Sequence, residues 1–90
     1  MNGSWEFVLN QSSAEYILSL RLKERERILS ALADLLSNPQ RVPDFREHGA
    51  CGRQYSVVVC GPYSITYWLD SLIQEIRIVR VLKTRSRSRL

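Results

Sequence analysis

The sequence has few of the side chains that bind metals or cross-link chains: of its 90 residues, two are cysteine and one is histidine. Cys51 and Cys60 do not form a Cys-x-x-Cys pair, and His48 has no partner at metal-ligand spacing. We therefore expect reduced thiols, no metal site and no cofactor. No run of about 18 apolar residues occurs, so no membrane-spanning helix is expected. The first ten residues lack a basic leader before an apolar segment, and we expect a cytoplasmic location.

Acidic residues are absent from the end of the sequence, where four cations are concentrated. These cations are Lys83, Arg85, Arg87 and Arg89. The rest of the chain holds nine basic and nine acidic residues, so the formal net charge of +4 is the charge of this segment. Concentrated cations at the end of a strand suit binding to phosphates or to an acidic partner. Because 44% of the residues are hydrophobic, we expect one folded domain over residues 1–84 and a basic tail over residues 85–90.

The first half of the chain is predicted to form one strand and two helices. Alternating apolar residues over 5–9 indicate a short strand. Ser12 stands three residues before Glu15, a spacing that fits a capping box at the start of the first helix. A stripe of apolar residues at helical spacing, followed by the helix-stopping pair Asn38-Pro39, predicts the second helix. The stripe consists of Ile28, Leu29, Leu32, Leu35 and Leu36.

The second half is predicted to form three strands after a long loop. Residues 40–52 show no sustained period, so we expect a loop without regular structure, which is often functional in a compact domain. From Arg53 the period becomes two, and Gly61-Pro62 connects the first two strands as a hairpin. The last strand, residues 75–83, is expected to alternate strictly. One face would carry Ile76, Ile78, Arg80 and Leu82, and the other Arg77, Val79, Val81 and Lys83.

The predicted order is therefore strand, helix, helix, strand, strand, strand. An α+β architecture satisfies this order, with an N-terminal strand and a helical hairpin packed on a mostly antiparallel four-stranded sheet (β-α-α-β-β-β). The helices are expected to cover one face of the sheet. The opposite face and the end of the last strand would then be left for function.

Three segments, in this order, resemble the RelE/ParE superfamily, the toxins of bacterial type II toxin–antitoxin pairs, over nearly the whole chain. The family shows a pattern like Leu-x-x-Asn-Pro after its helical hairpin, found here at residues 35–39. A hairpin pattern like Gly-x-Tyr-x-Ile-x-Tyr is found at residues 61–67. The closing strand resembles Glu-Val-x-Ile-x-x-Val-x-His at residues 75–83, with Ile76 and Lys83 in place of valine and histidine.

The resemblance implies a toxin held by a small cognate antitoxin, and it leaves the cellular target open. RelE-type members cleave mRNA on the ribosome as endoribonucleases (mRNA interferases). ParE-type members inhibit DNA gyrase without enzymatic activity. A relative that binds antitoxin but has lost its toxicity is a third alternative. In each case an acidic antitoxin is expected to bind this basic chain at a rate that depends on salt.

Cleavage of RNA by its 2′-hydroxyl needs a base, cations that stabilise the charged phosphorane, and an acid for the leaving oxygen. The resemblance implies three catalytic candidates, with Arg53 expected to point toward the same end of the sheet as the other two: Arg53, Lys83 and Arg85. Candidates for nucleic-acid contacts, or else for solvated surface charge, are Arg80, Arg87 and Arg89. The set is incomplete, because Ser64 replaces an arginine of the ribonuclease members and residues 56–59 contain no lysine.

Three further side chains have two interpretations each. Tyr55 and Trp68 either pack within the protein or stack on an RNA base, as exposed aromatic residues do on the sheets of other RNA-binding proteins. His48 is either an ordinary surface residue or a proton carrier, and the second interpretation requires that its loop fold over the sheet.

Overall fold

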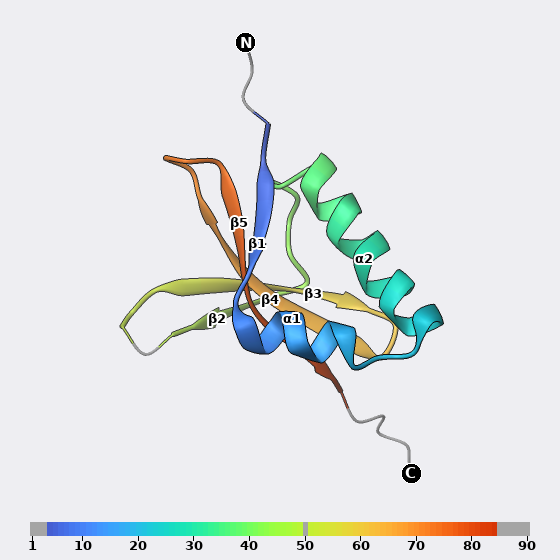
Figure 1. Cartoon of the computed structure of the whole chain (residues 1–90). Coiled ribbons are helices and arrows are strands. Elements are labelled where there is room, and N and C mark those ends of the chain that lie inside the picture. The colour runs from blue at the N-terminus through green and yellow to red at the C-terminus, as the bar shows by residue number, and fades with distance from the viewer. Residues whose placement is uncertain (1–3, 50, 85–90) are drawn as a thin grey trace.

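A five-stranded sheet carries two helices on one face in the computed structural model, which describes residues 4–49 and 51–84 (Figure 1). The predicted α+β class and the predicted order of elements are confirmed, with one additional strand. In chain order the elements are β1 (Glu6–Leu9), α1 (Gln11–Leu18), α2 (Leu22–Ser37), β2 (Phe45–His48), β3 (Gln54–Cys60), β4 (Tyr63–Asp70) and β5 (Glu75–Lys83). Within the described ranges, neither helix is long and apolar enough to cross a membrane.

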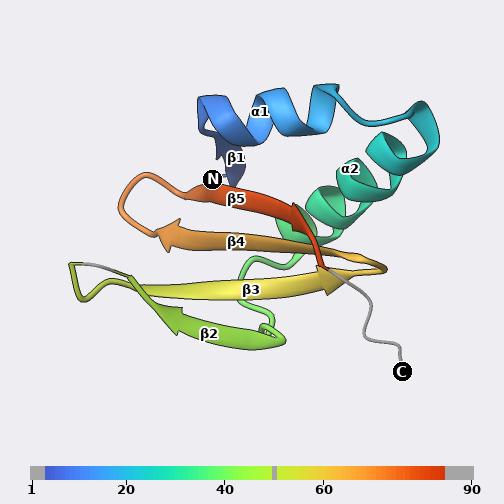
Figure 2. The same cartoon turned by 90° about the horizontal axis from the view of Figure 1, so that it is seen from below.

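The strands lie in the order β1-β5-β4-β3-β2, and every neighbouring pair is antiparallel except β1 and β5. Figure 2 shows β5, β4, β3 and β2 side by side in this order, with β1 beyond β5. The prediction of four strands is wrong, because residues 40–52, expected to be a loop, contain β2. All four residues of this edge strand are exposed, and only Phe45 is apolar. A strand without a buried face leaves no hydrophobic period in the sequence.

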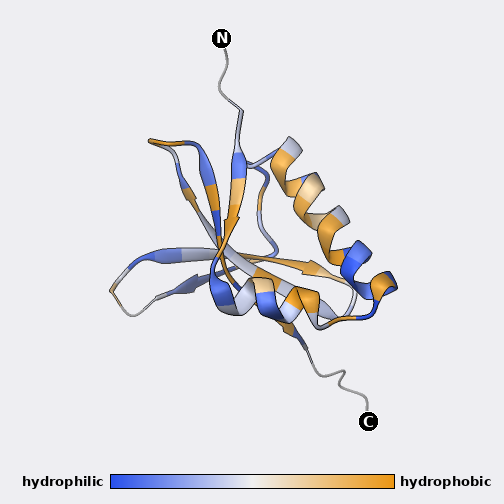
Figure 3. Cartoon of the chain, in the orientation of Figure 1, coloured by the Kyte–Doolittle hydropathy of each residue, from blue (hydrophilic) through white to orange (hydrophobic). Residues whose placement is uncertain are grey.

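The hydrophobic core lies between the helices and one face of the sheet. The predicted stripe on α2 is confirmed at Ile28, Leu32 and Leu35, which are buried, whereas Leu29 is 42% exposed. The strands contribute alternate residues to this core, among them Val58, Tyr63, Ile65, Tyr67, Ile76 and Ile78. Figure 3 shows apolar residues along α2 and along the central strands that it faces. Because successive side chains of a strand point to opposite faces, the residues between these positions lie on the other side of the sheet.

A β-bulge in β5 changes which of its side chains face the helices. Two consecutive residues of β4, Tyr67 and Thr66, pair with Ile78 and Arg80. Val79 is therefore an extra residue on β5. Beyond the bulge Val81 is the buried residue, and Arg80 lies on the opposite face. The strict alternation predicted for residues 75–83 is therefore wrong after Ile78.

The start of α1 is held by Asn10 and not by the predicted capping box at Ser12. The side chain of Asn10 accepts a hydrogen bond from the backbone nitrogen of Ser13 at 2.9 Å, which makes Asn10 the N-cap of the helix. Its Nδ2 also donates to the backbone oxygen of Val79 at 3.0 Å. Asn10, which follows β1, thus caps α1 and contacts the bulge of β5 with one side chain.

Replacing Asn10 by alanine should lower the free energy of unfolding by about 1–2 kcal/mol, because both the cap and the bond to β5 are lost. Urea unfolding followed by circular dichroism measures this change. Ser12→Ala is the matched control and should change the free energy by less than about 0.5 kcal/mol, as exposed substitutions usually do. If the Ser12 variant lost more stability than the Asn10 variant, Ser12 would be the N-cap of α1.

Candidate functional site

The face of the sheet opposite the helices is not covered by any described element. The β4–β5 and β2–β3 hairpins diverge on the side of the molecule away from α2 (Figure 1). We call this surface the open face and define it by the side chains that the strands present there and by Arg53, which precedes β3. They are Glu47, Arg53, Tyr55, Thr66, Trp68, Asp70, Glu75, Arg77 and Arg80, together with Phe45, Val57, Val59, Ser64 and Leu82 toward the end where β3 finishes.

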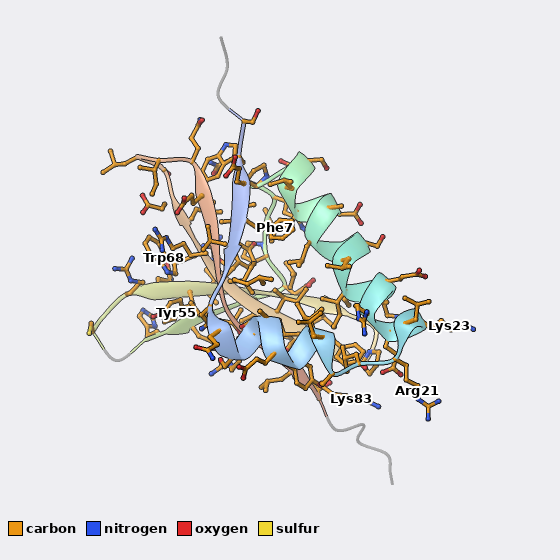
Figure 4. The ribbon with its side chains drawn as sticks, in the orientation of Figure 1. Phe7, Arg21, Lys23, Tyr55, Trp68 and Lys83 are labelled. Atoms are coloured by element: carbon orange, nitrogen blue, oxygen red, sulfur yellow. The ribbon has the colours of Figure 1, made fainter. Side chains whose placement is uncertain are left out.

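An aromatic and cationic stack lies at one end of the open face. The guanidinium of Arg53 lies 3.8 Å from the centroid of the Trp68 ring, and that of Arg77 lies 5.8 Å from it. Both distances are within the range of cation–π attraction. Arg77 also forms an ion pair of 2.8 Å with Glu75 on its own strand. Tyr55 lies on the strand beside Trp68, and Figure 4 shows both rings on the same side of the molecule.

A hollow of about 320 Å³ lies beside this stack on the open face. Its lining residues are Glu47, His48, Gly49, Tyr55, Thr66, Val79 and Arg80. The Nη2 atom of Arg80 is 2.9 Å from Oε1 of Glu47. A Cβ atom at Gly49 would collide with the Tyr55 ring, so a glycine is required for the ring to lie against this backbone. The hollow therefore combines a cation, a carboxylate and a phenol, and His48 borders it from the end of β2.

The structure brings together only some of the residues predicted from sequence. Arg80 and Arg53 both lie on the open face, and so do the two aromatic residues. Lys83 pairs with Tyr63, the first residue of β4, at the end of the sheet where β3 finishes. Arg53 stands before the first residue of β3, at the opposite end. The expectation that Arg53 and Lys83 point toward the same end of the sheet is therefore wrong. Their individual roles stay predictions.

Three of the predicted site residues are not part of the described structure. Arg85, Arg87 and Arg89 lie outside residues 4–49 and 51–84. The expected basic tail over residues 85–90 lies outside them as well.

Lys83 belongs to a different surface, on the helix side of the sheet. The hydroxyl of Tyr63 donates a hydrogen bond to Glu24 at the start of α2. This bond, together with the positive charges of Lys83 and Arg21, holds the pKa of Glu24 below its ordinary value, although partial burial opposes the shift. Hydrogen bonding to Glu24, with burial, raises the pKa of Tyr63 to about 12. Figure 4 shows Lys83 and Arg21 at this end of the molecule, away from Trp68.

The bond between Tyr63 and Glu24 should stabilise the fold fully between the ordinary pKa values of the two groups, and progressively less outside them. Since the pKa of Glu24 is lowered from 4.5, its contribution is present above pH 4.5 and is lost as the pH falls through the folded value. Since the pKa of Tyr63 is raised from 10.0 to about 12, its contribution is present below pH 10.0 and is lost on the alkaline side. Urea midpoints of wild type and Tyr63→Phe should therefore converge as the pH falls below 4.5. A constant difference would contradict this account.

The sequence did not identify Glu47 as a member of the site. Its partner Arg80 is 33 residues away in the chain, and β2 was not predicted. The participation of His48 required its segment to fold over the sheet, but this segment extends the sheet at its edge as β2. His48 pairs with Gln54, so its side chain lies on the face opposite to Glu47 and Tyr55. The only available signal was the adjacency of an acidic residue and a histidine in an otherwise irregular segment. Among the described residues, no group of three His, Cys, Asp or Glu side chains is arranged to hold a metal ion.

Comparison with known proteins identifies the fold. No protein-family model and no curated protein sequence matches the chain. Among solved structures, the chain is similar to the archaeal RelE–RelB complex from Pyrococcus horikoshii, with a TM-score of 0.73 and 17% identity over 96% of this chain and 100% of that one.

Two bacterial structures agree with this comparison. The isolated RelE toxin of E. coli matches with a TM-score of 0.77 and 13% identity, over 93% of this chain and 88% of that one. The toxin–antitoxin complex RelBE2 of Mycobacterium tuberculosis matches with a TM-score of 0.70 and 17% identity, over 92% and 100%. The chain therefore has the fold of the RelE toxins, and the resemblance to the RelE/ParE superfamily is confirmed at the level of the fold.

Proposed function

We propose that this chain is the toxin of a type II toxin–antitoxin pair, and that it cleaves mRNA on the ribosome, in the cytoplasm, through its open face. The shared fold with RelE toxins, two of them in complexes with antitoxins, supports the toxin–antitoxin class. The observation that supports the proposed activity is the hollow, in which Arg80 and Tyr55 lie beside each other on the open face, next to Trp68.

Arg80 and the two aromatic rings of the open face each have a part in this reaction. Arg80 stabilises the negative charge that develops on the phosphorane, because a guanidinium presents several donors to phosphate oxygens. Tyr55 and Trp68 stack on an unpaired base, a contact that single-stranded RNA makes with exposed aromatic rings. This assignment takes its cation from β5, since residues 56–59 contain no lysine.

The partner is a cognate antitoxin, an acidic protein that neutralises this basic chain. The formal net charge of +4 favours such a partner, and long-range attraction between opposite charges makes the association rate depend on salt. We include contacts of Lys83 and of the basic segment 85–90 with this antitoxin in the proposal, because these residues carry the net positive charge.

Mapping of mRNA ends tests the proposed activity. The purified protein is incubated with translating ribosomes, and the 5′ ends of the mRNA are mapped by primer extension. New ends within the coding sequence are the expected result, and mRNA that stays intact at a dose that stops growth would reject the proposal. Free mRNA without ribosomes is the control for contaminating nucleases.

Inhibition of DNA gyrase is the second candidate function, and two features of the open face favour it. Arg77 and Arg80 both form ion pairs with carboxylates, so their charges are partly neutralised. Toward the other end of the same face, Phe45, Val59 and Leu82 are exposed apolar residues that suit a protein target. A supercoiling assay separates the two functions, because inhibition of gyrase with intact mRNA would select this one.

A further inference from the structure

The ion pair between Glu47 and Arg80 joins two strands that are not neighbours. Glu47 lies on the edge strand β2 and Arg80 on β5, with β3 and β4 between them. Three strand spacings correspond to about 14 Å along a flat sheet. The charged ends are nevertheless only 2.9 Å apart. The two side chains therefore reach toward each other across the open face, over β3 and β4.

This pair lies at the hollow, and both of its members line it. Thr66, which is buried, and Tyr55 come from the two strands beneath it and also line the hollow. An anionic ligand that enters the hollow therefore meets a guanidinium that already carries a carboxylate.

We propose that Arg80 is the receptor for a phosphodiester of single-stranded RNA and that Glu47 is its internal competitor, which occupies the guanidinium while no RNA is bound. The inference rests on the proposed function, since it concerns how the same face engages RNA. Carboxylate and phosphate present their oxygens to a guanidinium in the same forked geometry. Glu47 thus holds the position that a phosphate oxygen takes in the complex.

The exposure of the pair makes this exchange feasible. The side chains of Arg80 and Glu47 are 48% and 47% exposed, so water screens their attraction. Exposed ion pairs contribute little to stability, and a polyanion that also gains aromatic contacts can displace the carboxylate. Glu47 is on a short edge strand with four exposed residues, where its side chain can turn outward.

Arg77 does not have the same freedom. Its guanidinium contacts Glu75 at 2.8 Å, its Nε lies 4.0 Å from Asp70, and its plane lies near the Trp68 ring. These partners come from the same strand and its immediate neighbour. Within the described part of the chain, Arg80 has Glu47 as its one ion-pair partner. The two arginines of β5 therefore differ, and only Arg80 can exchange its single partner for a phosphate.

Binding of a labelled single-stranded RNA, carrying 2′-O-methyl groups so that it cannot be cleaved, tests the inference by fluorescence anisotropy. Glu47→Gln should bind about fivefold more tightly than wild type, because the competing charge is removed. Glu75→Gln is the matched control: it removes one negative charge from the same face and should change the affinity less than twofold. Glu47→Ala is a second variant that should reproduce the gain, and thermal melting verifies that each variant is folded.

A double-mutant cycle with Arg80→Gln assigns the effect to the pair. If Glu47 competes for Arg80, the gain from Glu47→Gln should disappear in the Arg80→Gln background. The inference is overturned if the gain persists there, if Glu75→Gln gives an equal gain, or if neither Glu47 variant binds more tightly. If the wild type cleaves mRNA but any of these three outcomes is observed, only this inference fails and the proposed function stands. If no variant binds RNA and mRNA stays intact, the proposed function fails with it.

Discussion

Replacing Arg80 by glutamine should lower the rate of ribosome-dependent mRNA cleavage by about a hundredfold. Removal of one preorganised donor aimed at developing charge typically costs 10²–10³ in rate, and Arg80 is the cation of the hollow. Glutamine keeps much of the length of the side chain and removes its charge. The rate is measured from the appearance of new mRNA ends with equal amounts of purified wild type and variant.

Two comparisons make this result specific. Arg46→Gln makes the same change on β2 at an exposed position beside Glu47, and it should leave the rate within about threefold of wild type. Lys83→Gln tests the catalytic role that the resemblance implies for the end of the last strand. If the Lys83 variant loses as much activity as the Arg80 variant while remaining folded, the open face is not the whole site. If Arg80→Gln keeps full activity, the assignment of Arg80 is wrong.

Replacing Ile28 by alanine should lower the free energy of unfolding by about 2–5 kcal/mol. Ile28 is 0% exposed and lies on the buried stripe of α2, where it belongs to the same cluster as the residues of β4 and β5. The loss combines the transfer of apolar atoms to water with the cavity that remains. Because small domains have a total stability of about 5–15 kcal/mol, this variant should be partly unfolded at mild urea concentrations. Urea unfolding gives the value directly.

Leu29→Ala is the matched control for this prediction, because it removes a similar volume from the next position of the same helix. Leu29 is 42% exposed, so the expected loss is below about 1.5 kcal/mol. Equal losses in the two variants would mean that α2 does not pack through the Ile28 stripe.

The helices and the β3–β4 hairpin could be predicted from sequence because their apolar residues follow a clear period. The stripe on α2 placed Ile28, Leu32 and Leu35 correctly, and alternation over residues 61–67 placed the core residues of β4. β2 could not be predicted, since an exposed edge strand buries nothing and has no period. The cap at Asn10 was missed because Ser12 fits a common capping pattern two positions later.

The candidate site could be predicted only in part, because it is built from contacts between distant segments. Trp68 and Tyr55 were recognised as candidates for base stacking, and the structure places both on the open face. The pairing of Arg80 with Glu47 depends on the position of an unpredicted strand. The expected proximity of Arg53 to Lys83 failed because β3 and β5 run in the same direction, so the start of one and the end of the other lie far apart.

The bulge at Val79 also bears on insertions and deletions in this strand. β5 has one residue more than its pairing with β4 uses, and the surplus lies between Ile78 and Arg80. Deletion of Val79 would restore regular pairing between β4 and β5 and leave each later side chain on its present face of the sheet. A one-residue insertion between Arg80 and Val81 would instead invert the rest of the strand and turn Val81 outward. Deletion of Val79 is therefore expected to disturb the strand less than an insertion after Arg80, although it removes the acceptor of the Asn10 bond.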